Sequence, residues 1–68
     1  MKIVLNGEPR ELRSPATVVD AVDASGAPES RDGVAVAVGG EVVPRSSWAD
    51  HTLAEGDQVE VLQAVQGG

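Results

Sequence analysis

The stretch QVEVLQAV at residues 58–65 decides the fold, because it predicts an apolar strand near the end of the sequence. Side chains alternate between the two faces of a strand, so we expect Val59 and Val61 to face a core. An apolar strand of this kind needs neighbours on both sides, which places it inside a sheet. Because the two faces alternate, the apolar residues Leu62, Ala64 and Val65 cannot all point inward. Some apolar surface should therefore remain exposed near the end of the strand.

A second apolar strand is predicted at the other end of the sequence, over residues 2–6. Asn6 and Gly7 both tolerate positive φ, which two-residue hairpin turns require. This turn predicts a partner strand at about residues 10–13, with Leu12 as its inward residue. We therefore expect the chain to begin with an antiparallel hairpin.

A short helix is predicted after the hairpin. Thr17 suits the N-cap position, and Asp20 favours the positive end of the helix. Residues 25–28, SGAP, stop the helix, because glycine forms a left-handed cap and proline cannot continue it. The apolar stripe at helical spacing consists of Val18, Ala21 and Val22. Since Val-rich helices are weak alone, this one has to pack against the sheet.

Two further strands are predicted in the middle of the chain. Residues 34–38, VAVAV, carry apolar groups on both faces, as an interior strand does. A diglycine turn then leads into a short strand at residues 41–43. Residues 46–50 suit one helical turn, and Trp48, the only aromatic residue, is expected to plug one end of the core.

The predicted order is strand, strand, helix, strand, short strand, helical turn, strand. A hairpin, a helix across one face and a central last strand make an α+β fold of the β-grasp type, with a mixed sheet of about four to five strands. The 68 residues are 41% hydrophobic, mostly Val and Ala, which suits one small sheet-rich domain. We place this domain at residues 1–65 and a flexible tail at residues 66–68.

Composition and charge exclude several classes of function. There is no cysteine, so disulfides and thiolate metal sites are excluded. The net charge of −6 argues against nucleic-acid binding and fits a partner with a basic docking surface. No apolar run approaches the ~20 residues that a membrane span needs, and no long apolar leader is visible. We therefore expect a cytoplasmic protein.

No catalytic constellation is visible in the sequence. His51 is the only histidine, so no histidine pair can bind a metal, and we expect it to be a solvated surface residue. Ser47 and Asp50 stand close to it, but no nucleophile-elbow motif accompanies them. We expect a protein that is not an enzyme itself and binds no cofactor.

The remaining candidate for chemistry is the tail. Gly67 and Gly68 have no Cβ, so they can enter a narrow channel in a partner, with Gln66 leading into them. A carboxylate is a poor electrophile, but an ATP-using partner could activate that of Gly68 as an acyl-adenylate. Sulfur could then displace AMP and leave a thiocarboxylate. The apolar residues beside the tail (Leu62, Ala64 and Val65) would dock the partner.

Several segments of the sequence occur together in one known family. They are Met1-Lys2-Ile3, Asn6-Gly7, Thr17-Val18, residues 34–38, Val43-Pro44-Arg45, Trp48, Leu53, Gly56-Asp57, Val59-Glu60-Val61 and residues 64–68. On these segments the chain resembles the ThiS family, the ubiquitin-like sulfur carriers of thiamine biosynthesis, over essentially its full length. The resemblance implies a β-grasp fold and adenylation of Gly68 by an ATP-dependent adenylyltransferase. A sulfur donor system would then supply the sulfur, and thiazole synthase would receive it.

Other readings stay open at this point. The closest is a sulfur carrier of another pathway, such as the small subunit of molybdopterin synthase or a carrier for cysteine synthesis. A ubiquitin-like protein modifier is a second reading, although Lys2 is the only lysine to which copies could be joined. A third is a β-grasp interaction domain with an inert tail.

Overall fold

The computed structural model describes residues 1–64. The first half of the chain forms the β-strands β1 (Lys2–Leu5) and β2 (Glu8–Glu11) and the helix α1 (Val18–Ala24). The second half forms β3 (Val34–Val38), β4 (Glu41–Val43), the 3₁₀ helix η1 (Arg45–Ser47) and β5 (Gln58–Gln63). This is the predicted order of elements.

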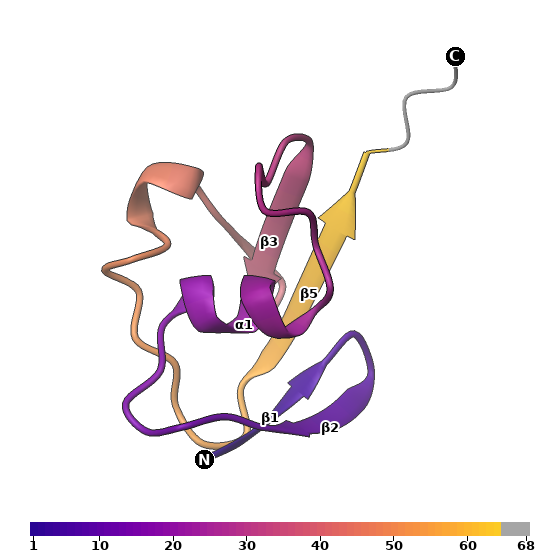
Figure 1. The fold of residues 1–68 in the computed structure, drawn as a ribbon. Coiled ribbons are helices and arrows are strands. Elements are labelled where there is room, and N and C mark those ends of the chain that lie inside the picture. The colour runs from indigo at the N-terminus through magenta and orange to yellow at the C-terminus, as the bar shows by residue number, and fades with distance from the viewer. Residues whose placement is uncertain (65–68) are drawn as a thin grey trace.

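The five strands form one sheet in the order β2-β1-β5-β3-β4. The last strand, β5, lies in the centre, parallel to β1 and antiparallel to β3 (Figure 1). Helix α1 crosses one face of this sheet. The prediction of a mixed β-grasp sheet with a central last strand is therefore confirmed.

The β1–β2 hairpin turns at Asn6 and Gly7, whose φ angles are both positive, 50° and 82°. A two-residue turn pairs the flanking residues at once, so Glu8 lies opposite Leu5 and β2 begins there. The predicted second strand exists, but its bounds at residues 10–13 were wrong, since it lies two residues earlier. Leu12 follows the strand, and its predicted inward position is confirmed because it packs against the core, half-buried.

Helix α1 begins after Thr17, as predicted. The Thr17 N–H donates to the Asp20 carboxylate at 2.8 Å, which satisfies a backbone donor that the helix leaves free. At the other end Ser25 is the C-cap, and Gly26 follows with a φ of 83°. The buried side of the helix consists of Val18, Ala21 and Val22.

Strands β3 and β4 have the predicted bounds. The short helical turn comes earlier than predicted, at η1 (Arg45–Ser47) instead of residues 46–50, because Pro44 has an extended backbone and serves as its N-cap. Trp48 follows η1 and is 2% exposed, and its indole N–H donates to the Val43 carbonyl at 2.9 Å. Its predicted role as a plug of the core is confirmed.

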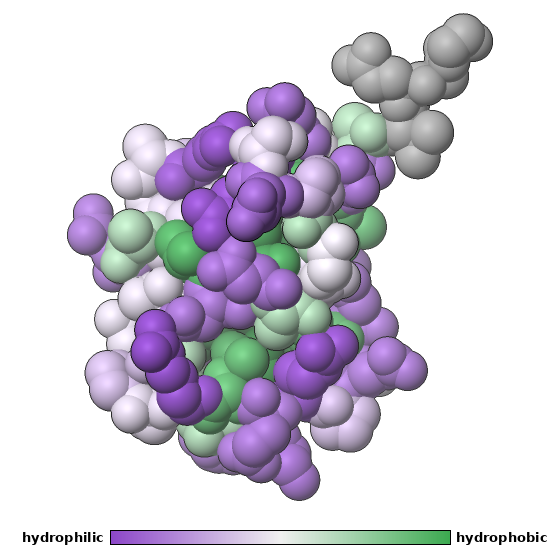
Figure 2. Space-filling view, viewed as in Figure 1, coloured by the Kyte–Doolittle hydropathy of each residue, from purple (hydrophilic) through white to green (hydrophobic). Residues whose placement is uncertain are grey.

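The core lies between α1 and the sheet. Its hydrophobic members alternate along the strands with outward residues, as the pleat requires. They are Ile3, Leu5, Ala16, Val18, Ala21, Val22, Val36, Val43, Trp48, Leu53, Val59 and Val61. Seen from the helix side, hydrophilic side chains cover much of the surface and apolar ones show between them (Figure 2).

Candidate functional site

The sheet face opposite α1, here called the outer face, carries the two large apolar side chains with the highest exposure among residues 1–64. Val42 of β4 is 75% exposed and Leu62 of β5 is 63% exposed. Their opposite neighbours on β3 are Ala37 and Ala35, so small side chains separate them. This arrangement gives the outer face an apolar strip across three strands, which is typical of a protein-binding surface.

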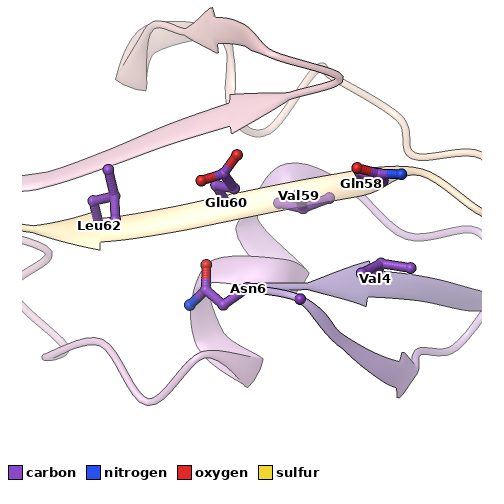
Figure 3. Close-up of a pocket in the computed structure, with 7 residues that line it drawn as sticks. Val4, Asn6, Gln58, Val59, Glu60 and Leu62 are labelled. Atoms are coloured by element: carbon purple, nitrogen blue, oxygen red, sulfur yellow. The ribbon is translucent and has the colours of Figure 1, made fainter.

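Two hollows lie on the outer face, and Glu60 and Leu62 line both of them. The larger, of about 380 Å³, lies between β5 and the end of β1, where Val4 and Asn6 form its other wall (Figure 3). The second, of about 170 Å³, lies over β3 and β4 against Val42. Glu60 therefore stands as a single acidic group between two partly apolar depressions.

Asn6 connects β1 to β5 beyond the point where their backbones pair. Its side-chain oxygen accepts from the Val61 N–H at 2.8 Å, and its amide nitrogen donates to the Val61 carbonyl at 3.3 Å. The side-chain amide thus makes the two hydrogen bonds to β5 that the backbone of a further β1 residue would make. This support fixes β5 close to its end, where the predicted site begins.

The end of β5 is also held from the other side. The Ala64 N–H donates to the Gly33 carbonyl at 2.8 Å, and a Cβ on Gly33 would lie 3.5 Å from that of Ala64. Strand β5 ends at Gln63 and not at Val65 as predicted, although Ala64 keeps this one bond to the loop before β3. This hydrogen bond connects the last described residue to the loop before β3.

The predicted site residues fall into two groups. Leu62 and Ala64 are exposed, which agrees with the expectation of apolar surface near the tail. Their docking role stays a prediction. Val65, Gln66, Gly67 and Gly68 lie outside the described residues.

Two features of the outer face did not emerge from sequence reasoning. Val42 was placed on the correct strand, but its exposure depends on which face β4 turns outward. The bridge from Asn6 to Val61 joins residues 55 positions apart. The only signal for it was the Asn-Gly pair, which indicates a turn and not a cross-strand contact.

The residues around His51 are connected through the backbone and not through side-chain hydrogen bonds in residues 1–64. The His51 N–H donates to the Ser47 carbonyl at 2.9 Å, and no side-chain hydrogen bond joins Ser47, Asp50 and His51 in the described part of the chain. His51 is half-buried, so it is less exposed than the predicted solvated surface residue. Its carbonyl accepts from the first residue of α1, Val18, at 3.0 Å, which draws the loop towards the helix.

No three His, Asp or Glu side chains come together in residues 1–64 as metal ligands would. Over the same residues the one α-helix has seven residues, and no helix has the length and apolar character to cross a bilayer.

The fold and the exposed outer face define the class of protein first, as a small β-grasp protein of the ubiquitin-like type. A sequence model described as the ThiS family matches residues 3–68, and the chain belongs to this family.

Individual relatives agree with this assignment. The sulfur carrier protein ThiS of Escherichia coli (strain K12) is 29% identical over 68 residues, the whole length of both chains. A thiazole synthase of Paramagnetospirillum magneticum (strain ATCC 700264 / AMB-1) is 38% identical over 68 residues, which are 100% of this chain and 20% of that protein.

Solved structures show the same fold. The crystal structure of the thiamine biosynthesis protein ThiS from Geobacter metallireducens superimposes with a TM-score of 0.78 at 28% identity and covers 100% of both chains. A solution structure of a thiamine biosynthesis protein from the same organism gives a TM-score of 0.79 at 28% identity, over 100% of this chain and 88% of the other.

Proposed function

We propose that this chain is a sulfur carrier of thiamine biosynthesis and that the carboxyl group of Gly68 carries the sulfur. The observation that carries the proposal is the family match, which runs to residue 68 and so includes the diglycine pair. The end-to-end similarity to the E. coli sulfur carrier supports it.

The chemistry takes two steps. The Gly68 carboxylate attacks the α-phosphorus of ATP, which releases pyrophosphate and forms an acyl-adenylate. A hydrosulfide equivalent from the sulfur donor system then attacks the acyl carbon, AMP leaves, and a thiocarboxylate remains. The chain supplies the carboxyl group and a binding surface, while the ATP belongs to the adenylyltransferase. Because the reaction consumes ATP, we place it in the cytoplasm.

The proposed docking surface is the outer face beside the tail. Leu62 and Ala64 are exposed there, and Val65 continues the apolar run in the sequence. Apolar contacts at the centre of such a surface exclude water, while charged groups at its rim steer the partner.

Thiazole synthase is the proposed acceptor of the sulfur. A relative named thiazole synthase contains a segment 38% identical to the whole of this chain. When a sulfur carrier and the acceptor of its sulfur occur in one polypeptide, the two are expected to act in the same pathway. This argument favours thiamine over the other sulfur pathways.

The test is intact-protein mass spectrometry after incubation with ATP, the adenylyltransferase and a sulfur donor. Exchange of one oxygen for sulfur should raise the mass by about 16 Da, and removal of Gly68 should abolish the change. Trp48 lies in the core, so its fluorescence and the thermal unfolding of the truncated chain should stay nearly unchanged.

An unchanged mass, under conditions that convert a known carrier, would contradict sulfur carriage. A chain that is converted but passes no sulfur to thiazole synthase would contradict the thiamine assignment alone. A large loss of stability on removal of Gly68 would show instead that the residue is structural.

A further inference from the structure

Strand β5 has a free edge at its last residue, Gln63. Backbone groups of successive strand residues point to opposite neighbours. The Gly39 N–H donates to the Gln58 carbonyl and the Ala64 N–H to the Gly33 carbonyl, both at 2.8 Å. The even-numbered residues of β5 therefore face β3, and the odd-numbered residues face β1.

On the β1 side the backbone partners end at Asn6. The Asn6 N–H donates to the Val59 carbonyl at 2.9 Å, and the Asn6 side chain bonds both backbone groups of Val61. The next residue that faces this side is Gln63. It is exposed, and its backbone N–H and carbonyl have no partner within residues 1–64. Unpaired strand groups of this kind are a template for another strand.

Hollows lie on both faces of the sheet at this edge. On the outer face is the depression of about 380 Å³ between Asn6 and Leu62 (Figure 3). On the helix side a hollow of about 190 Å³ is lined by Val61, Gln63 and the residues that follow α1. A strand laid along the edge would point its side chains alternately to the two faces, where each hollow offers room.

We propose that an extended segment of the adenylating enzyme adds as a strand to β5 at Gln63. This inference rests on the proposed function, because that function supplies the partner. The Gln63 N–H and carbonyl would pair with the backbone of the segment. Its side chains on the outer face would meet Leu62 and Glu60, and those on the helix side would meet Val61.

Three observations favour this enzyme over a second copy of the chain. Gly68 lies five positions beyond Gln63, a stretch that spans at most about 18 Å, so a segment bound at Gln63 keeps the carboxyl group near the same protein. The chain has a net charge of −6, so two copies repel each other. Glu60 is exposed and has no ion-pair partner among the described residues, which suits a segment with a Lys or Arg on its outer side.

The first test replaces Gln63 by proline, which removes the N–H that faces the free edge and leaves the bonds to β3 intact. Proline is tolerated where a strand N–H has no partner in the sheet. Binding to the purified adenylating enzyme of the same organism, measured by calorimetry without ATP, should weaken about tenfold for Gln63→Pro. Gln63→Ala keeps the N–H and should bind about tenfold more tightly than Gln63→Pro. Ser46→Pro, in the first turn of η1, is the control for the introduction of a proline.

The second test needs no variant. In NMR hydrogen exchange on the wild-type chain, the Gln63 amide should exchange at least about tenfold more slowly in the complex than in the free chain. The Leu62 amide, which already bonds β3, should change little.

An unchanged Gln63 exchange rate in the complex, or equal affinities of Gln63→Pro and Gln63→Ala, would overturn strand addition. Slow exchange of Gln63 in the concentrated free chain, with dimers in sedimentation, would assign the edge to a second copy and also overturn it. Thiocarboxylate formation by the wild-type chain is measured in parallel, so failure of the carrier function appears separately.

Discussion

At the scale of single residues, Asn6 has two structural roles, one through its backbone and one through its side chain. Its φ of 50° lies in the left-handed region, which asparagine tolerates better than most residues. Its side chain also bonds Val61 on β5. The same residue therefore closes the β1–β2 turn and extends the central pairing of the sheet.

We expect Asn6→Ala to lower the free energy of unfolding by about 2 kcal/mol, roughly half from the positive φ and half from the lost hydrogen bonds. Asn6→Gly keeps the turn and should cost only about 1 kcal/mol. Urea unfolding followed by the fluorescence of Trp48 measures both values. Equal losses for the two variants would show that the backbone angle contributes nothing.

At the scale of elements, the outer face depends on strands and not on the helix. Helix α1 has seven residues, too few to be stable alone, and it forms because its apolar stripe packs on the inner face. Nothing in residues 1–64 packs over Leu62 and Val42 in the same way, since both stay largely exposed. The two faces of one sheet thus have different tasks, a core on one side and a surface open to a partner on the other.

Leu62→Asp should reduce the affinity for the adenylating enzyme about tenfold, because a carboxylate would have to lose its water in an apolar contact. Since Leu62 is exposed, the free energy of unfolding should change by less than about 0.5 kcal/mol. Calorimetry gives the affinity and urea unfolding the stability. Ser46→Asp adds the same charge on η1, and an equal loss of affinity in that variant would point to net charge alone.

At the scale of the whole molecule, charge governs how a partner approaches. The chain carries 11 acidic and 5 basic residues, and each ion pair of its described part has one partner with an exposed side chain. Such pairs add little to stability, so the net charge of −6 acts mainly on association.

The association rate constant with the adenylating enzyme should fall about tenfold when the ionic strength rises from about 0.05 to 0.5 M. The dissociation rate constant should change much less, because the apolar contacts of the bound state carry no charge that salt could screen. Stopped-flow mixing, with the fluorescence of a dye on Lys2 as the signal, measures both. A rate constant independent of salt would show that the charge plays no part in the encounter.

Patterns within about ten residues predicted most of the elements correctly. Strands 34–38 and 41–43, the turn at Asn6-Gly7 and the N-cap Thr17 follow from local periodicity and turn chemistry. The errors occurred where one sequence pattern was compatible with two local structures. Leu12 indicated an inward strand residue, but it packs on the core from beyond β2.

The sequence by itself determined the elements, their order and the family, and with the family it pointed to Gly68 as the residue to test. These features depend on neighbours in the chain, whose spacing can be read directly. Only the tertiary structure decided which side chains of the sheet stay exposed, how Asn6 supports Val61, and that β5 has a free edge at Gln63. The physical reason is that these features come from pairing between strands far apart in sequence, where register and face follow from the packing of the whole molecule.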